Sequence, residues 1–191
     1  MIDEGIPTRS AVILTRTGLP DPLEQVLAHK LAYDGRLSVR EIQRTWELKA
    51  ELVTLSACET ALGREAGGEG FVGFSQALSL SGARSVCLSL WKVDDKATAL
   101  LMQRFYANLL GRRAGLSQPM PKVEALDEAK RWLRGLTVDE VGGELAALAR
   151  GAVRPLAEAS GAGPVSLAAS GSRPYAHPYY WAAFVLAGDP D

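Results

Sequence analysis

Cys58 is the residue whose type and position best suit nucleophilic chemistry. It follows a short apolar run, residues 52–57, and precedes a polar segment with glycines at positions 63, 67, 68 and 70. Such a run is typical of a buried parallel strand, and catalytic sites of α/β proteins gather beyond the carboxyl ends of those strands. A thiol there can attack a carbonyl carbon. Cysteines are also common as small core residues, so position alone leaves the role of Cys58 open.

A cysteine nucleophile needs a base or a helix N-terminus, because a thiol with a pKa of about 8.5 is mostly protonated at neutral pH. The chain has two histidines, His29 and His177. His29 lies in a segment, residues 23–31, that fits either a helix or a strand. His177 stands just before the last apolar run. We expect both to be surface or structural residues.

Three other kinds of site find little support. The glycine-rich segment lacks the Gly-Lys-Ser/Thr ending of a phosphate-binding P-loop. No group of His, Cys, Asp and Glu residues has the spacing of metal ligands, and we expect no cofactor. Cys87 lies between apolar neighbours inside a second apolar run, so we expect it to be structural.

The composition bounds the class of protein. The chain has 191 residues, 47% of them hydrophobic, and a formal net charge of −1, which favours one domain with a sizeable core and gives no basic field for nucleic acid. Its apolar run at 181–187 is far short of the roughly 20 residues of a membrane helix, and the first residues lack a signal-peptide pattern. Two cysteines make no disulfide framework. We therefore expect a cytoplasmic protein without membrane contact.

The elements expected around Cys58 alternate between strand and helix. Strands are predicted at 10–15, 52–57, 84–91 and 179–186, and helices at 39–47, 71–81, 96–110, 122–136 and 137–150. Residues 52–91 form a strand–helix–strand unit, which implies a parallel pair. Capping boxes open two of the helices, Ser38 with Glu41 and Thr137 with Glu140. Gly82 suits the position after a helix end.

Two details of the C-terminal half are also predicted. On the helix at 122–136, Val123, Leu126 and Leu133 are expected to share one side. Residues 151–174 consist mostly of Ala, Gly, Ser and Pro, which is typical of a flexible insertion or a long surface loop.

Several segments carry a family resemblance in addition. The first is Leu52-Val53-Thr54-Leu55-Ser56-Ala57-Cys58-Glu59-Thr60, and further matching blocks lie at 10–14, 34–42, 68–74, 82–86, 89–95 and 177–189. Together they resemble CHAT domains, the caspase-like domains associated with TPR repeats. The likeness covers nearly the whole chain and keeps the family order.

The resemblance implies a caspase-like three-layer α/β sandwich with a mostly parallel central sheet, built by residues 1–191 as a single domain. It also implies a cysteine endopeptidase that hydrolyses peptide bonds with a Cys-His dyad. Cys58 would be the nucleophile, and backbone N–H groups beside it, at Ala57 and Glu59, would help form the oxyanion hole. The substrate would be a protein or peptide, and a TPR-type region or partner would regulate the domain.

The sequence departs from the family at the histidine. CHAT domains carry that histidine in a His-Gly motif on the preceding strand, and no His-Gly dipeptide occurs here. We therefore expect an N-terminally truncated domain whose catalytic histidine lies upstream. The sheet edge beside the Cys58 strand would then be exposed and would favour pairing with a second copy. The alternative is a catalytically inactive CHAT interaction module that docks with a TPR or other partner.

Asp94 and Asp95 have two interpretations. They follow the strand next to the Cys58 strand, so we expect them to face the same crevice. The first interpretation is that they cap the helix at 96–110. The second is that one of them lines the S1 pocket and prefers a basic side chain at the cleaved position, with a contribution from Glu59.

Overall fold

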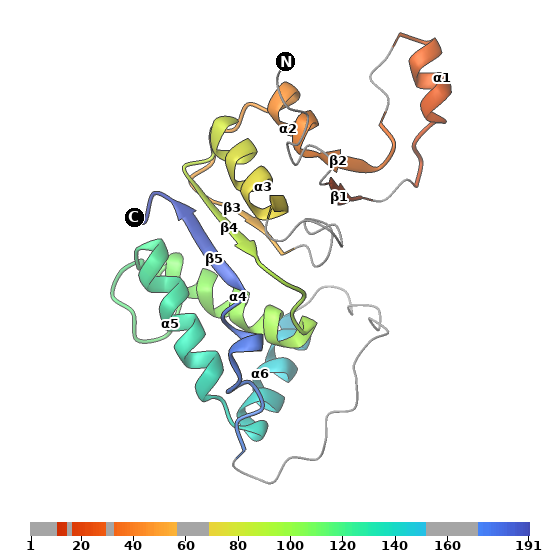
Figure 1. Cartoon of the computed structure of the whole chain (residues 1–191). Helices are drawn as coiled ribbons and strands as arrows, with labels where there is room; N and C mark the ends of the chain where they lie inside the picture. Colours follow the sequence, from red (N-terminus) through yellow and green to blue (C-terminus); the bar gives the residue numbers. More distant parts are fainter. Residues whose placement is uncertain (1–10, 15–16, 30–32, 57–68, 152–171) are drawn as a thin grey trace. The chain divides into compact units, whose positions relative to one another are not determined.

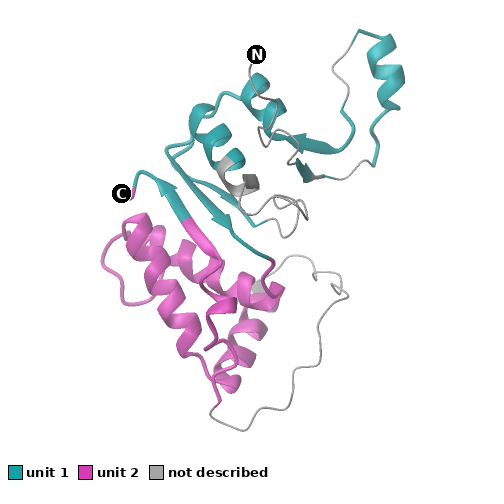
Figure 2. Ribbon diagram, in the orientation of Figure 1, with its two compact units in different colours: residues 1–91, 186–189 teal, residues 92–185, 190–191 magenta. Residues whose placement is uncertain are grey.

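The structure is a computed structural model that describes residues 11–14, 17–29, 33–56, 69–151 and 172–191 (Figure 1). The chain divides into two compact units, which Figure 2 distinguishes by colour. Unit 1 comprises residues 1–91 and 186–189, and unit 2 comprises residues 92–185 and 190–191. The chain contains both strands and helices, so it is a mixed α/β protein, as predicted.

The predicted strand–helix–strand unit supplies the first two strands of a three-stranded sheet, whose order is β3-β4-β5. Strands β3 (Val53–Leu55) and β4 (Ser85–Ser89) are parallel, with Val53 opposite Val86. Helix α3 (Glu69–Leu80) connects them. The parallel β3–α3–β4 unit is therefore confirmed.

Strand β5 (Phe184–Gly188) runs in the opposite direction to β4. The backbone N–H of Asp189, just beyond the end of β5, donates to the carbonyl of Arg84, just before the start of β4, at 3.0 Å. The described sheet thus has one parallel and one antiparallel pair of neighbours. The described strands therefore do not show the mostly parallel central sheet that was predicted.

The first strands of unit 1 form an antiparallel pair, β1 (Ala11–Ile13) and β2 (Arg36–Ser38). Helix α1 (Pro22–Leu27) lies in their connection, which settles the ambiguous segment at 23–31 as partly helical. The sequence did not predict β2, because three residues are too few to display an alternating pattern. Its last residue, Ser38, is also the cap of the next helix, α2 (Val39–Thr45).

The core of unit 1 lies between these helices and the sheet. Buried side chains on α3 recur at helical spacing, with Phe74, Ala77 and Leu78 almost fully covered. They pack in one cluster with side chains from α2, from the turn after α3 and from β4: Val39, Ile42, Ala83, Val86 and Leu88. This cluster fixes the position of β4, and with it the paired strand β3.

Unit 2 is built on three helices, α4 (Asp95–Leu109), α5 (Lys122–Gly135) and α6 (Val138–Gly151). Buried residues of α4 and α5 include Leu101, Phe105, Leu126 and Leu133. The prediction that Val123 shares the buried side of α5 is wrong, because this side chain is exposed. It lies about 100° around the helix from the centre of the buried stripe.

A polar network joins α4 to α5. Arg104 contacts both carboxylate oxygens of Glu128, at 2.6 and 3.0 Å, and the fully buried Asn108 donates to the same carboxylate at 2.5 Å. Burial alone would raise the pKa of Glu128, but the hydrogen bonds from Arg104 and Asn108 outweigh it and lower that pKa. The two helices are therefore held in register by charge as well as by packing.

The predicted strand at 179–186 begins later than expected. Tyr179 and Tyr180 belong to a short 3₁₀ helix, η1 (Pro178–Tyr180), and the strand itself is β5. Pro178 starts η1 because its ring already fixes the backbone angle that a helical turn needs. The aromatic residues of this run led us to predict a strand. In the structure, the ring of Tyr180 instead packs edge-on against those of Tyr175 and Tyr179.

Most of the predicted insertion at 151–174 lies outside the described residues. Its last part is described, and the carbonyl of Ser172 accepts a hydrogen bond from the N–H of Val138 at the start of α6. None of the helices in the described part of the chain is both long and apolar enough to cross a membrane.

Candidate active site

The Cys58 segment follows directly from β3. That strand ends at Leu55, three residues before Cys58. Ala57, Cys58 and Glu59 themselves lie outside the described residues. The predicted roles of these three residues therefore stay predictions, whereas the parallel strand that leads to them is present.

A tight turn after α3 fixes the start of β4, the strand that pairs with β3. Gly82 has a positive φ of 105°, and the N–H groups of Gly82 and Ala83 donate to the carbonyls of Ser79 and Leu78. This is the paired hydrogen-bond pattern that ends many helices at a glycine. A Cβ at Gly82 would lie 2.1 Å from the carbonyl oxygen of Leu48, so the backbone can approach this closely only because the residue is glycine. The predicted role of Gly82 is confirmed.

Asp94 caps helix α4. Its Oδ1 accepts a hydrogen bond from the N–H of Ala97 at 2.9 Å, and Asp95 stands in the first turn with an exposed side chain. Both carboxylates are well placed against the partial positive charge of the helix N-terminus. The capping interpretation is confirmed for Asp94. Both residues belong to unit 2 and the Cys58 segment belongs to unit 1, so a shared crevice stays a prediction.

Tyr175 is a buried phenol in unit 2 that the sequence reasoning did not single out. Burial raises its pKa to about 12, and the nearby negative charges of Asp94 and Tyr180 act in the same direction. The hydroxyl is therefore neutral over the whole physiological range. Tyr175 directly follows the Ala/Gly/Ser-rich segment and belongs to no periodic pattern, so only the folded arrangement reveals it.

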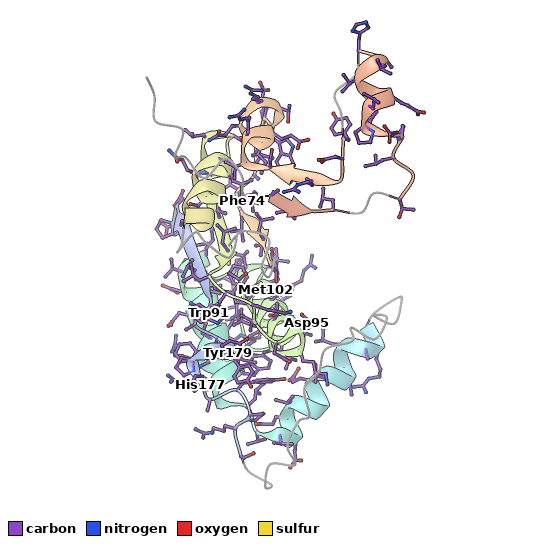
Figure 3. The ribbon with its side chains drawn as sticks, turned by 45° about the vertical axis from the view of Figure 1, so that its right-hand side comes forward. Phe74, Trp91, Asp95, Met102, His177 and Tyr179 are labelled. Carbon is purple, nitrogen blue, oxygen red and sulfur yellow. The ribbon has the colours of Figure 1, made fainter. Side chains whose placement is uncertain are left out.

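His177 has a structural role. Its Nδ1 accepts a hydrogen bond from the N–H of Tyr179 at 3.2 Å and so caps η1. Figure 3 labels both residues, together with Asp95 on α4. Because Nδ1 is already engaged with the backbone, this ring is held as a cap, and the prediction that His177 is structural is confirmed.

His29 lies just beyond the end of α1. It is exposed, its φ is 54°, and its N–H donates to the carbonyl of Val26 at 3.0 Å. That is the left-handed position after a helix, usually taken by glycine. Cys87, by contrast, is fully buried in β4, as predicted for a core cysteine.

Comparison with known proteins assigns the family. Residues 2–189 match the CHAT domain family, which is nearly the whole chain. The chain belongs to the CHAT domain family. No curated protein and no solved structure matches it.

The match places Cys58, Asp94 and His177 all within this CHAT domain. It also extends across both compact units, so the family corresponds to the two units together. As a CHAT domain, the chain is a caspase-like domain related to peptidases. Within the described residues, no group of three or more His, Cys, Asp and Glu side chains is arranged to hold a metal ion.

Proposed function

We propose that this CHAT domain is the cysteine-bearing part of a caspase-like endopeptidase and that Cys58 is its nucleophile. The observation that supports this most is the family match over residues 2–189 combined with the position of Cys58 just after a strand with a parallel partner. Loops at the carboxyl ends of parallel strands are where α/β proteins place reactive side chains.

The proposed reaction is acyl transfer to a thiolate. The sulfur of Cys58 attacks the scissile carbonyl carbon, and the backbone N–H groups beside it stabilise the developing oxyanion. A histidine takes the thiol proton and returns it to the leaving amine, and water then hydrolyses the thioester. We place this histidine outside the 191 residues, since His177 caps η1 and the sequence has no His-Gly dipeptide.

For specificity, we propose that a carboxylate after β4 favours a basic side chain at the cleaved position. Asp94 and Asp95 are the candidates, and Asp95 has the more exposed side chain. Asp94 keeps one carboxylate oxygen for the helix cap, so its replacement would also loosen the first turn of α4. Asp95→Asn is therefore the cleaner test, with loss of cleavage after Arg or Lys as the expected result.

The experiment that tests Cys58 is alkylation by iodoacetamide across pH, with the modified residue identified by mass spectrometry. In a longer chain that supplies the histidine, we expect Cys58 to react with an apparent pKa below about 8.5, the value of an ordinary thiol. Cys87 is the internal control, because its fully buried side chain should react only after unfolding. A Cys58 that titrates as an ordinary thiol in that longer chain would contradict the proposal that it is an activated nucleophile.

The second candidate is a docking module without catalysis, in which a TPR or other partner binds the same fold. The absence of a His-Gly dipeptide favours it. A related proposal is self-pairing at the outer edge of β3, which has β4 as its one neighbour among the described strands. The test is a longer chain that restores a His-Gly motif. If this chain hydrolyses peptides, and if Cys58→Ala abolishes that activity while Cys87→Ala retains it, the docking module is excluded.

A further inference from the structure

Helix α1 is joined to unit 1 mainly through one side chain. Of its six residues only Gln25 is buried, Pro22 is half-buried, and the other four are exposed. The helix makes no extensive contact with any other helix or strand that the structure describes. A helix this short is not stable by itself in water, because its first turn fixes several residues for a single hydrogen bond. The order of α1 therefore depends on the contacts of Gln25.

The side-chain amide of Gln25 makes hydrogen bonds with both its nitrogen and its oxygen. The nitrogen donates to the carbonyls of Pro20 and Tyr33, at 2.9 and 3.0 Å, and the oxygen accepts from the N–H of Tyr33 at 2.9 Å. Pro20 precedes α1 and Tyr33 follows it, so this one amide holds the helix to the chain on both sides. Because a buried amide with only some of its partners is costly, we expect the three bonds to form and break together.

The strands on either side of α1 are anchored independently of it. Strand β1 pairs with β2 along its whole length, and the N–H of Leu14 donates to the carbonyl of Gly35 at 2.7 Å. Val12 on β1 and Leu37 on β2 pack against the core cluster of unit 1. None of these contacts involves a residue of α1. Melting of α1 would therefore leave the strand pair and the core cluster in place.

We propose that α1 is a local order–disorder switch and that Gln25 is its latch. With the amide engaged, the helix is held to the segments before and after it. With the amide released, α1 melts as one unit while β1, β2 and the core cluster stay folded. Local openings of this kind cost less free energy than global unfolding, and the segments that change state in regulation are drawn from them. The switch lies between β1 and β2 and does not depend on the role of Cys58.

Amide hydrogen exchange of the whole chain tests the switch, because it reports how readily each part of the structure opens. The amides of residues 25–29 report on α1, and those of β4 report on the core. Gln25→Ala removes the latch, whereas Gln25→Glu keeps the size of the side chain and removes both donated hydrogen bonds. Gln43→Ala is the matched control, because Gln43 is an exposed glutamine on the next helix, α2.

In the wild type we expect the α1 amides to be protected but to exchange faster than those of β4, since they open locally. Gln25→Ala and Gln25→Glu should each raise the exchange rate in α1 at least about tenfold, because the buried hydrogen bonds that hold the helix are lost. Exchange in β4 should stay that of the wild type in both variants. Gln43→Ala should change neither region.

Three results would overturn the proposal. Wild-type α1 amides that are unprotected, or that exchange as slowly as those of β4, would rule out a local switch. Unchanged exchange of α1 in Gln25→Ala or in Gln25→Glu would show that the amide is not the latch. Loss of β4 protection in either variant would show that α1 does not melt separately from the core.

Discussion

At the residue scale, the buried phenol of Tyr175 gives a pH dependence whose sign is fixed. Its pKa is about 12 in the folded chain and about 10 in the unfolded chain, so the folded state holds the proton more tightly. The stability contributed by this proton is fully present below pH 10 and is lost as pH rises from about 10 to 12. A titration of tyrosinate absorbance should show one late phenol, absent in Tyr175→Phe.

The Tyr175→Phe variant should also lose less stability between pH 10 and 12 than the wild type does. Tyr179→Phe is the matched control, because that ring is exposed at the neighbouring turn and its removal should leave the late titration in place. An unchanged late phenol in Tyr175→Phe would contradict the assignment.

Local side-chain caps could be predicted from the sequence, because they involve residues three or four apart. Glu41 N–H donates to Ser38 Oγ at 3.1 Å, and the N–H of Thr137 donates to Glu140 at 2.8 Å, each as the spacing predicted. The hydrogen bonds that the N–H and the hydroxyl of Thr137 donate to the carboxylate also lower the pKa of Glu140. Gln25 and Tyr175 could not be predicted, because their roles depend on segments that meet only in the folded chain.

At the scale of elements, the turn between α3 and β4 should tolerate no side chain. Gly82→Ala combines a left-handed backbone with a Cβ 2.1 Å from the Leu48 carbonyl oxygen. The matched control is Gly115→Ala. Gly115 has a φ of 85° and nothing within 4 Å of its Cβ position, so this variant measures only the cost of a left-handed backbone at alanine. We expect Gly115→Ala to cost about 1 kcal/mol and Gly82→Ala about 3 kcal/mol or more, measured by urea denaturation. Equal losses of stability in the two variants would contradict an energetic cost of the contact between residue 82 and the Leu48 carbonyl oxygen.

Element types were predictable where the apolar period was long, as for α4 and α5, and at the strand–helix–strand unit around Cys58. Short elements were harder. The last residue of β2 is also the cap of α2, and the aromatic run before β5 begins with η1, which Pro178 opens. The segment with Cys58, on which the site prediction depends, lies outside the described residues, so the family match rather than side-chain geometry supports that site.

At the scale of the whole molecule, the C-terminal residues serve both units. Asp189 contacts Arg84 and Ser85 in unit 1, through an ion pair at 3.3 Å and a hydrogen bond at 2.6 Å. Lys130 in unit 2 donates to the carbonyl of Phe184 at 2.6 Å. Removal of residues 184–191 should therefore reduce amide protection in both units, as measured by hydrogen exchange.

A shorter truncation separates the two contributions. Removal of residues 190–191 alone takes away the contacts of Pro190 and Asp191 with the first turn of α5, at Val123 and Lys122, and leaves β5 and Asp189 in place. We expect amide protection in β4 to survive this change. Its loss in the shorter truncation would contradict the role given to β5.

The return of β5 to β4 also constrains how the chain is made. The hydrogen bond from Ser85 to Asp189 joins residues 104 positions apart. A chain synthesised from its N-terminus completes residues 1–91 long before residue 189 emerges, so β4 lacks its second neighbour during the synthesis of about 100 residues. Throughout that interval its open backbone groups are exposed to other nascent chains. Emergence of residues 184–189, rather than the completion of residues 1–91, is therefore the event that closes this sheet edge.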